Sequence, residues 1–479
     1  MKQLIKRILY ISTLAILLPA VSCKKRNPNS GGGGTVVPST TKSITSFVFT
    51  AADNPGIPAD ITGVITTDSV IIAVPYGTNI TALKPVVQHT GILVTPASKT
   101  PQNFSSPVTY IVKAEDGSTK NYLVIVKIHL KSTVYAGSGD GKLYAFDGDN
   151  GAVKWTYSTS GAITGACPAY YNGTVFIGST DGYMYAIDAV TGLLKWKYST
   201  GSNLGGSSPA VNAAGLLCFG NATGSGPQFL KALNAVTGVK LWERSHANAI
   251  LFPTLYNGVI YAGGLYGLDG FNAADGTPGV HFSSDIIGGN PMVVNNVVYA
   301  GTEGSIVTAY DAATGAVKWF YRDTQGGNVS VFSPTLYKGT IYNTGNSNYL
   351  YAIDSATGTL KWKFTSGINS YALCSPVVAN DIVYTVNANG RLYAVDAFTG
   401  NQRWLFDDGI SGYTTPYYSC TVKGETVYFG NHTKKMYAVN ALTGALKWQY
   451  LTGGAISGGA CVLAEDGSVS YSGISGQQQ

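Results

Sequence analysis

Cysteine is the residue type of this chain that is best suited to redox or metal chemistry. The sequence holds six cysteines, and Cys23 stands apart because it directly follows an apolar segment near the N-terminus. The remaining five are dispersed, and no two of them are adjacent: Cys167, Cys218, Cys374, Cys420 and Cys461. An odd, scattered set of this kind does not indicate a disulfide framework. We expect these five side chains to be buried thiols that form neither a disulfide nor a metal site.

The other segments that could do chemistry are incomplete. The segment DGDNG at 147–151 resembles the start of a calcium-binding loop, but Gly151 and Ser158 occupy its fifth and twelfth positions, where such a loop needs stronger ligands. The glycine-rich segments 137–141 and 224–228 do not lead from a strand into a helix, so neither indicates a phosphate site. The five histidines lack metal-ligand spacing. We therefore predict no catalytic residue and no metal ligand in this chain.

The chain contains eight copies of one repeated unit, and these repeats must form the framework that positions any binding surface. The clearest copy is YAIDSATGTLKWKF at 351–364, which predicts a strand, a Thr-Gly turn and a second strand. In the eighth copy Val280 stands where the others have Trp. A repeat of about 40 residues with four short strands is typical of a β-propeller. In the other seven copies a Trp follows an Asp or Asn by eight residues: Trp155, Trp196, Trp242, Trp319, Trp362, Trp404 and Trp448.

The two ends of the repeat region are expected to share one blade. Proline-led runs predict the innermost strand of most units, and the Trp motif predicts the two outer strands. The repeats begin with a second strand at 134–137, whereas the last innermost run, 458–467, lies near the C-terminus. Pairing of these segments would close an eight-bladed ring over 131–479 without an open sheet edge. The run 468–473 is one strand more than this arrangement needs, and the sequence does not place it.

The repeats resemble the pyrroloquinoline-quinone-like (PQQ-like) propeller repeats, whose consensus runs Tyr-x-Ala-Asp-x-x-Thr-Gly-x-x-x-Trp. This resemblance covers the region from residue 131 onward and implies an all-β fold with eight blades. In that family the Trp packs between neighbouring blades, and the turn Gly lets the chain close beneath it. We therefore expect the seven Trp to be structural blade-docking residues, because a large indole anchors each interface. They are not expected to stack on nucleic acid bases.

The first 41 residues are predicted to be a targeting and tethering segment. A basic start and an apolar run at 8–18 are typical of a signal peptide and too short for a membrane span. Small residues directly before Cys23 resemble the lipobox of bacterial lipoproteins, which implies a lipoprotein signal peptide over 1–22 and lipid attachment at Cys23. The alternative is plain cleavage near Ser22. The polar Gly/Ser/Pro-rich stretch 23–41 predicts a flexible linker.

Residues 42–130, between the linker and the repeats, lack the Trp motif and predict a small β-sandwich. Alternating and β-branched runs are frequent, and Asp116-Gly117 predicts a hairpin because this pair tolerates the positive φ of a tight turn. The segment resembles the Ig-like modules that precede larger domains in bacterial surface lipoproteins. Such a module is either a spacer or a binding site for a protein or a glycan, and we favour the spacer.

The net charge of +6 comes from the N-terminal residues, and this bears on which partners the protein can bind. The rest of the chain is neutral overall, so no basic field is available to hold a nucleic acid backbone. We expect the lipid anchor to be the membrane contact, on the periplasmic or the surface side of the outer membrane. Two N-terminal clusters of three basic residues each account for the whole excess: Lys2, Lys6, Arg7, Lys24, Lys25 and Arg26.

Two functional classes are known among proteins with such repeats. Quinoprotein dehydrogenases hold the quinone and Ca²⁺ in the central funnel and use an adjacent Cys pair, which this sequence lacks. The resemblance is therefore to the propeller lipoproteins of the outer-membrane barrel-assembly machinery, and it implies a non-catalytic, cofactor-free protein-interaction scaffold. Its partner would be an envelope protein or a glycan. Two alternatives stay open: a PQQ- and Ca²⁺-dependent dehydrogenase, and a surface glycan-binding lipoprotein.

Three segments of the repeat region depart most from the consensus. They are 251–282, which contains Val280, together with 320–332 and 406–418. Such segments form a binding face if they gather at one end of the ring, where loops usually contact partners. Ordinary drift among repeats would produce the same departures.

Overall fold

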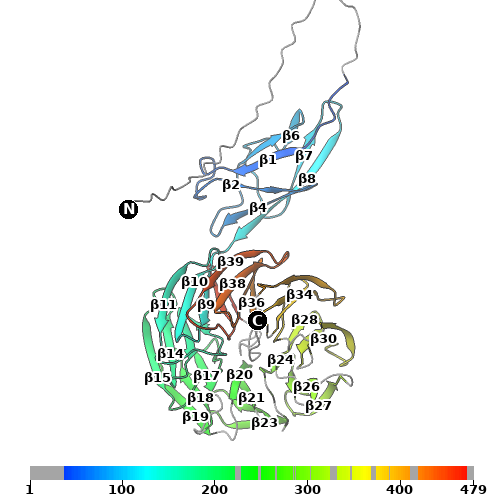
Figure 1. The fold of residues 1–479 in the computed structure, drawn as a ribbon. Helices are drawn as coiled ribbons and strands as arrows, with labels where there is room; N and C mark the ends of the chain where they lie inside the picture. The colour runs from blue at the N-terminus through cyan, green and yellow to red at the C-terminus, as the bar shows by residue number, and fades with distance from the viewer. Residues whose placement is uncertain are drawn as a thin grey trace, which may run out of the picture. The chain divides into compact units, whose positions relative to one another are not determined.

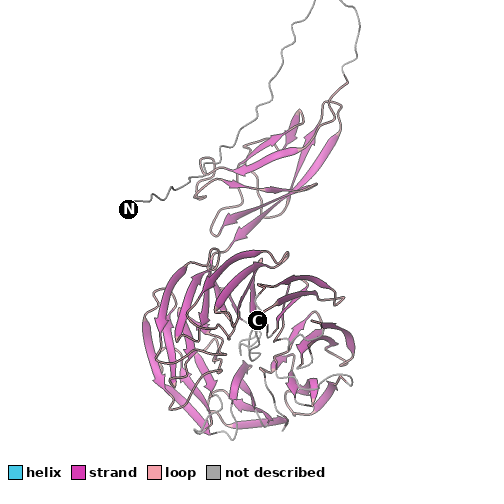
Figure 2. Cartoon of the chain, in the orientation of Figure 1, coloured by secondary structure: helices cyan, strands magenta, loops and turns pink. Residues whose placement is uncertain are grey.

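The structure, a computed structural model, describes residues 37–471 apart from 222–227, 246–249, 265–266, 284, 286, 288, 303, 324–331, 346–347, 368–373, 388 and 410–418. All of its regular elements are β-strands (Figure 2). The described chain divides into two compact units, with the change at Lys127–Ile128, and a short piece, Val74–Thr78, groups with the second unit. None of the described residues forms a helix with the length and hydrophobicity that a membrane crossing needs.

The N-terminal unit is a β-sandwich of one three-stranded and one five-stranded sheet, as the sequence predicts. Phe47 meets Tyr110 edge to face between the sheets, with the ring centroids 5.3 Å apart. The predicted hairpin at Asp116-Gly117 is present, and Gly117 has a φ of 83°. The first sheet, β2-β1-β5, contains β1 (Ile44–Phe49), β2 (Ile61–Thr62) and β5 (Pro85–His89). The second, β3-β4-β8-β7-β6, contains β3 (Val64–Ile65), β4 (Ser69–Pro75), β6 (Leu93–Thr95), β7 (Val108–Lys113) and β8 (Thr119–His129).

The C-terminal unit is an eight-bladed β-propeller, in which seven four-stranded sheets and one five-stranded sheet form a ring (Figure 1). We number the blades 1 to 8 in the chain order of their Trp motifs. Blade 1 contains β9 (Ser132–Gly137), β10 (Lys142–Asp147), β11 (Val153–Ser158), β40 (Cys461–Ala464) and β41 (Val469–Tyr471).

Blades 2 to 8 each take four consecutive strands. Blade 2 contains β12 (Ala169–Tyr171), β13 (Thr174–Gly178), β14 (Tyr183–Asp188) and β15 (Leu194–Ser199). Blade 3 contains β16 (Ala210–Val211), β17 (Leu216–Gly220), β18 (Phe229–Asn234) and β19 (Lys240–Ser245). Blade 4 contains β20 (Ile250–Tyr256), β21 (Val259–Gly264), β22 (Gly267–Asn272) and β23 (Pro278–Ser283). Blade 5 contains β24 (Met292–Val294), β25 (Val297–Thr302), β26 (Ser305–Asp311) and β27 (Val317–Tyr321). Blade 6 contains β28 (Thr335–Tyr337), β29 (Thr340–Thr344), β30 (Tyr349–Asp354) and β31 (Leu360–Thr365). Blade 7 contains β32 (Val377–Ala379), β33 (Ile382–Val386), β34 (Leu392–Asp396) and β35 (Gln402–Phe406). Blade 8 contains β36 (Cys420–Lys423), β37 (Thr426–Gly430), β38 (Lys435–Asn440) and β39 (Leu446–Leu451).

In blades 2 to 8 the strands follow chain order from the axis outward (Figure 1). The second and third strands are almost wholly buried, as in β13 and β14, whereas the outermost strand β15 is exposed or half-buried along its length. Neighbouring blades cover both faces of the inner strands, which explains why these strands are continuous apolar runs. The core therefore consists of a series of apolar clusters between adjacent blades.

Blade 1 joins the two ends of the propeller chain, as predicted. β40 pairs antiparallel with β9, and Cys461 lies opposite Tyr135. β41 pairs with the other edge of β40. Val469–Tyr471, the described part of the run that the sequence does not place, is thus a fifth strand on the axial side of blade 1. The Tyr471 hydroxyl of β41 also donates to the carbonyl oxygen of Tyr170 in blade 2, at 3.1 Å, so this strand links the two blades.

Candidate functional site

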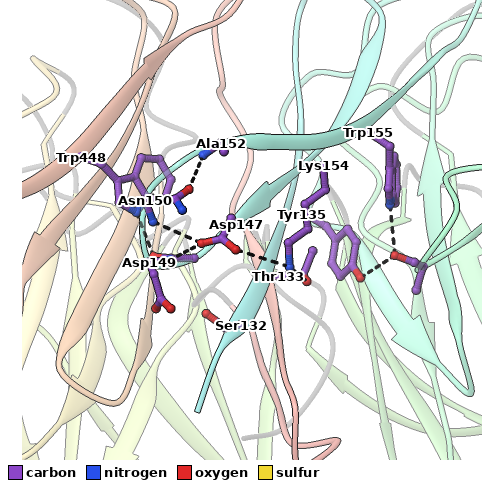
Figure 3. Close-up of polar contacts among 12 residues, drawn as sticks. Ser132, Thr133, Tyr135, Asp147, Asp149, Asn150, Ala152, Lys154, Trp155 and Trp448 are labelled. Carbon is purple, nitrogen blue, oxygen red and sulfur yellow. Dashed lines mark hydrogen bonds and ion pairs between the residues drawn. The ribbon is translucent and has the colours of Figure 1, made fainter. Parts of the chain in front are cut away.

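The repeated Asp builds the turn between the third and fourth strands of a blade. In blade 2 the Oδ1 atom of Asp188 accepts hydrogen bonds from the main-chain N–H groups two and three residues further on, at 3.1 and 2.9 Å. Chiefly through the Thr191 N–H, these bonds lower the pKa of Asp188 to about 2. Gly192 completes the turn with a φ of 71°. Segment 147–151 forms the same turn in blade 1, with Asp147 as the acceptor (Figure 3).

Each of the seven Trp side chains bridges to the next blade around the ring. The Nε1–H of Trp155 donates to the carbonyl oxygen of Ala189 at 3.1 Å, and that of Trp448 donates to Gly148 at 2.8 Å (Figure 3). Trp448 and Trp242 are buried, and the other five indoles are half-buried. The remaining pairs are Trp196 with Ala235, Trp242 with Ala273, Trp319 with Ser355, Trp362 with Ala397 and Trp404 with Ala441.

The turn Gly leaves room for the indole of the preceding blade. A Cβ atom on Gly192 would lie 2.6 Å from Cδ2 of Trp155, and one on Gly358 would lie 2.6 Å from Cε3 of Trp319. Carbon atoms do not approach so closely in a packed interior, so any side chain here would displace the ring. The Thr-Gly pair of the repeat therefore serves both the turn of its own blade and the indole of its neighbour.

A tyrosine from the second strand joins the indole at the same acceptor, a contact that the repeat spacing alone does not reveal. The Tyr135 hydroxyl donates to the Ala189 carbonyl oxygen at 2.9 Å, beside the bond from Trp155 (Figure 3). A Tyr two or three residues before the end of the second strand, as in Tyr-x-Gly at 135–137, is the sequence feature that accompanies this contact. The same pairing occurs between Tyr299 and Ser355, Tyr342 and Ala397, Tyr384 and Ala441, and Tyr428 and Gly148.

Blades 4 and 5 lack three side chains that most other blades carry. Val280 stands in the Trp position, and Gly279 stands where six of the other seven blades carry Lys or Arg. In blade 5, Thr308 replaces a Tyr that five blades carry three residues before the Asp or Asn. Among the described residues, no indole or phenol donates to the carbonyl oxygen of Ala312, the counterpart of Ala189. Two hollows lie at the interface between these two blades.

The first hollow has a volume of about 320 Å³ and lies beside the missing Lys and Trp. Its rim at Thr277, Pro278 and Gly279 is exposed. Its walls are mainly apolar, and most of them belong to blade 4. They include Val259, Phe271, Pro278, Val280 and Phe282 of blade 4 and Ala312 of blade 5.

The second hollow has a volume of about 180 Å³, lies beside Thr308 and shares Phe282 with the first. Three buried hydroxyl groups line it in a row. Oγ1 of Thr302 and Oγ of Ser305 lie 2.9 Å apart, and Oγ of Ser305 and Oγ1 of Thr308 lie 2.6 Å apart. Phe320, which is 58% exposed, stands at its edge. This hollow therefore combines hydroxyl groups with an exposed aromatic ring.

The structure also places the residues that could have carried redox or metal chemistry. The five described cysteines are buried, and none forms a disulfide. Burial raises the pKa of Cys420 to about 12, so this thiol is not a nucleophile at neutral pH. Within the described ranges, no three His, Cys, Asp or Glu side chains gather so that they could hold a metal ion. Cys23 lies outside the described residues, as do 324–331 and 410–418 of the variable segments.

The propeller matches a known protein family over most of its length. The family described as outer membrane protein assembly factor BamB matches residues 128–247 and 226–450. The chain belongs to the BamB family. The N-terminal unit matches a second family, described as SGBP, N-terminal, over residues 44–126. No curated protein matches the chain in sequence.

Solved structures share the propeller fold of this BamB-family chain. BamB from Moraxella catarrhalis is 18% identical, with 64% of this chain and 96% of that chain covered and a TM-score of 0.51. AztD from Citrobacter koseri is 11% identical, with 71% and 100% covered and a TM-score of 0.53. The computationally designed protein Ika8 is 16% identical, with 66% and 96% covered and a TM-score of 0.53. At these identities the similarity concerns the fold alone.

Proposed function

We propose that this BamB-family protein is a non-catalytic lipoprotein of the bacterial cell envelope, whose propeller is a protein-interaction scaffold. One observation carries the proposal: the polar and aromatic side chains of the repeat hold the ring together. Asp188 holds its turn, while Trp155 and Tyr135 both bind the next blade. Family membership over the propeller supports the same function. A rigid ring with variable loops is suited to holding partners.

The envelope location and the lipid anchor are part of the same proposal. They rest on the signal-like residues 1–22 and on Cys23, and the matched family is described as an outer membrane protein assembly factor. A Cys23→Ser variant is expected to lose incorporation of labelled palmitate and to leave the membrane fraction. Labelling at the wild-type level would exclude Cys23 as the attachment site.

The enzymatic alternative is tested by adding PQQ and Ca²⁺ to the purified protein. Quinone absorbance and Trp fluorescence report binding, and an alcohol or aldose with an artificial electron acceptor reports turnover. We expect no binding at tens of micromolar quinone and no dye reduction. Stoichiometric binding with dye reduction would overturn the scaffold proposal. Cross-linking in intact cell envelopes is expected to join the propeller to another protein, and its failure at every exposed loop would contradict the proposal.

Glycan binding at the cell surface is the second candidate function. The match of residues 44–126 to the SGBP N-terminal family favours it, because that family's name denotes surface glycan binding. The hollow beside Phe320 also suits a sugar, since the ring can stack on a sugar face while hydroxyl groups bond its edge. Retardation of the protein in polysaccharide gels tests this function. The Phe320→Ala variant should lose retardation, whereas Phe398→Ala, at a similarly exposed ring in blade 7, should keep it.

A further inference from the structure

On the basis of the scaffold function proposed above, we infer that the apolar hollow between blades 4 and 5 binds a Trp side chain of a partner protein. The hollow is the 320 Å³ space beside Gly279 and Val280. Its position in the repeat, its size, its walls and its exposed rim all favour a Trp side chain as the occupant.

The other interfaces show what this position of the fold binds. Between blades 5 and 6, Trp319 donates to the carbonyl oxygen of Ser355 at 3.2 Å and its ring lies against Gly358. Blade 5 keeps both receiving groups at the counterpart positions, the carbonyl of Ala312 and the turn Gly315. Blade 4 presents Val280 to them. Blade 5 therefore keeps the main-chain acceptor of an indole contact without its indole, while Val280 and His281 of blade 4 lie against Gly315.

The hollow is large enough for an aromatic ring and has suitable walls. An apolar cavity of about 150 Å³ accommodates benzene, and this hollow is about twice that volume. Phe271, Pro278 and Phe282 offer flat apolar surfaces to a ring. An indole gains from burial against such surfaces and from one hydrogen bond to a main-chain carbonyl, and Ala312, the counterpart of the carbonyl acceptors in the other interfaces, is among the lining residues.

Gly279 opens the hollow to solvent. In blade 6 the residue at this position is Lys361, whose Nζ donates to Oγ1 of Thr340 at 2.8 Å and to the carbonyl oxygen of Gly339 at 3.2 Å. That lysine thus lies across the start of the second strand. In blade 4 the counterpart of Thr340 is Val259, which lines the hollow. A side chain from outside can enter where the lysine would lie.

The inserted ring cannot copy the internal indoles in full. A Cβ atom on Gly315 would lie 2.6 Å from the carbonyl oxygen of His281, so the main chain of blade 4 already covers this glycine. The ring must therefore lie on the blade 4 side of the interface, against Phe271 and Pro278. The exposed rim at Thr277 leaves space for the backbone of the segment that carries the ring.

Titration of the full chain with N-acetyl-L-tryptophanamide tests the site directly. Ligand-observed NMR should detect saturable binding to one site with a Kd of about 1 mM or tighter. N-acetyl-L-leucinamide is the matched probe without a ring, and it should bind at least tenfold more weakly. Absence of saturable binding by the tryptophan probe would overturn the inference.

Two variants locate the binding. Val280→Trp supplies the missing indole from within, and Gly279→Lys restores the lysine that covers the entrance. Each should weaken probe binding at least tenfold. Val190→Trp adds an indole to the exposed turn of blade 2, where Val190 is 82% exposed, and should leave binding unchanged. Thermal unfolding of each variant checks that it folds. Unchanged probe binding by folded Val280→Trp and Gly279→Lys would exclude this hollow.

A photo-cross-linking amino acid separates this inference from the scaffold proposal. Thr277, at the rim, and Thr359, its exposed counterpart in blade 6, are the two positions to compare in intact cells. We expect a cross-linked protein from Thr277 that is absent from Thr359 and lost with Val280→Trp. A partner that cross-links elsewhere and is unaffected by Val280→Trp would keep the scaffold and exclude the hollow. Failure of cross-linking at every exposed loop would exclude the scaffold itself.

Discussion

The indole of Trp448 donates a hydrogen bond of 2.8 Å to the carbonyl oxygen of Gly148, 300 residues earlier in the chain. The hydroxyl of Tyr428 donates to the same oxygen at 3.1 Å. Blade 8 is thereby joined to blade 1, and its indole bond is of the same kind as in each other consecutive pair of blades that has a Trp. Together with the pairing of β40 and β9, this contact closes the ring.

Removal of the Trp448 indole is expected to destabilise the propeller strongly. Trp448 is 7% exposed, and a Trp→Ala change at such a site costs about 3–5 kcal/mol. Trp448→Phe keeps a ring but loses the donor to Gly148, so it should cost less, although the change in volume adds to the loss of about 1 kcal/mol for the bond. Guanidinium unfolding of both variants measures the difference. A Trp448→Ala midpoint equal to that of the wild type would show that the closure does not depend on the indole.

The ring itself could be predicted because each repeat carries its own docking group. A Trp eight residues after an Asp or Asn specifies a hairpin and an interface together, so counting motifs also counted blades. The place of β41 could not be predicted, because this three-residue strand has no counterpart in the other blades. The hydrogen bond from Tyr135 to the next blade could not be predicted either, because its acceptor, Ala189, lies 54 residues further along the chain.

The hollow between blades 4 and 5 shows the same limit at the candidate site. The loss of Trp at Val280 is visible in the sequence, but one substitution does not predict a hollow, because neighbouring side chains can collapse into the space. Its lining includes Gly279 and, from the facing blade, Ala312. The sequence does not show that Ala312 lines this hollow or that Thr308 lines a second one that shares Phe282.

Substitutions of two glycines in blade 6 distinguish the cost of backbone strain from the cost of a clash with an indole. Gly358 and Gly339 have φ values of 73° and 72°, but a Cβ on Gly358 would meet Trp319 at 2.6 Å, whereas a Cβ on Gly339 would meet nothing within 4 Å. Gly339→Ala should cost about 1–2 kcal/mol from the left-handed backbone. Gly358→Ala should cost about 1–3 kcal/mol more, because the ring must move. Equal unfolding midpoints for the two variants would show that the indole is not confined by the turn.

The buried thiols are expected to be inert in the native protein. Burial raises the pKa of Cys420 to about 12 and also raises the pKa of Cys218, so the reactive thiolate is scarce at neutral pH. A Cys23→Ser variant leaves the five described cysteines for thiol titration with Ellman's reagent. None should react before denaturation, and all five should react in guanidinium. Rapid reaction of one thiol in the native protein would identify an accessible, functional cysteine.

The Asp turns predict how stability depends on pH. The folded pKa of Asp188 is about 2, below its ordinary value of 3.8, chiefly because of the Thr191 N–H. A lowered folded pKa means that its contribution is complete above pH ~4 and is lost as the pH falls toward about 2. Asp188→Asn should therefore reduce the fall in melting temperature between pH ~5 and pH ~2.5.

Asn440 provides the reciprocal test, because it forms the same turn in blade 8 without a charge. Its Oδ1 atom accepts the N–H groups of Leu442 and Thr443 at 2.9 and 3.0 Å. Asn440→Asp should keep these bonds above pH ~4 and add a carboxylate that must be protonated at lower pH, so the acid sensitivity should increase. The two variants should thus change the melting temperature difference in opposite directions. A change of the same sign in both would mean that the turn carboxylates do not set the acid limit of the propeller.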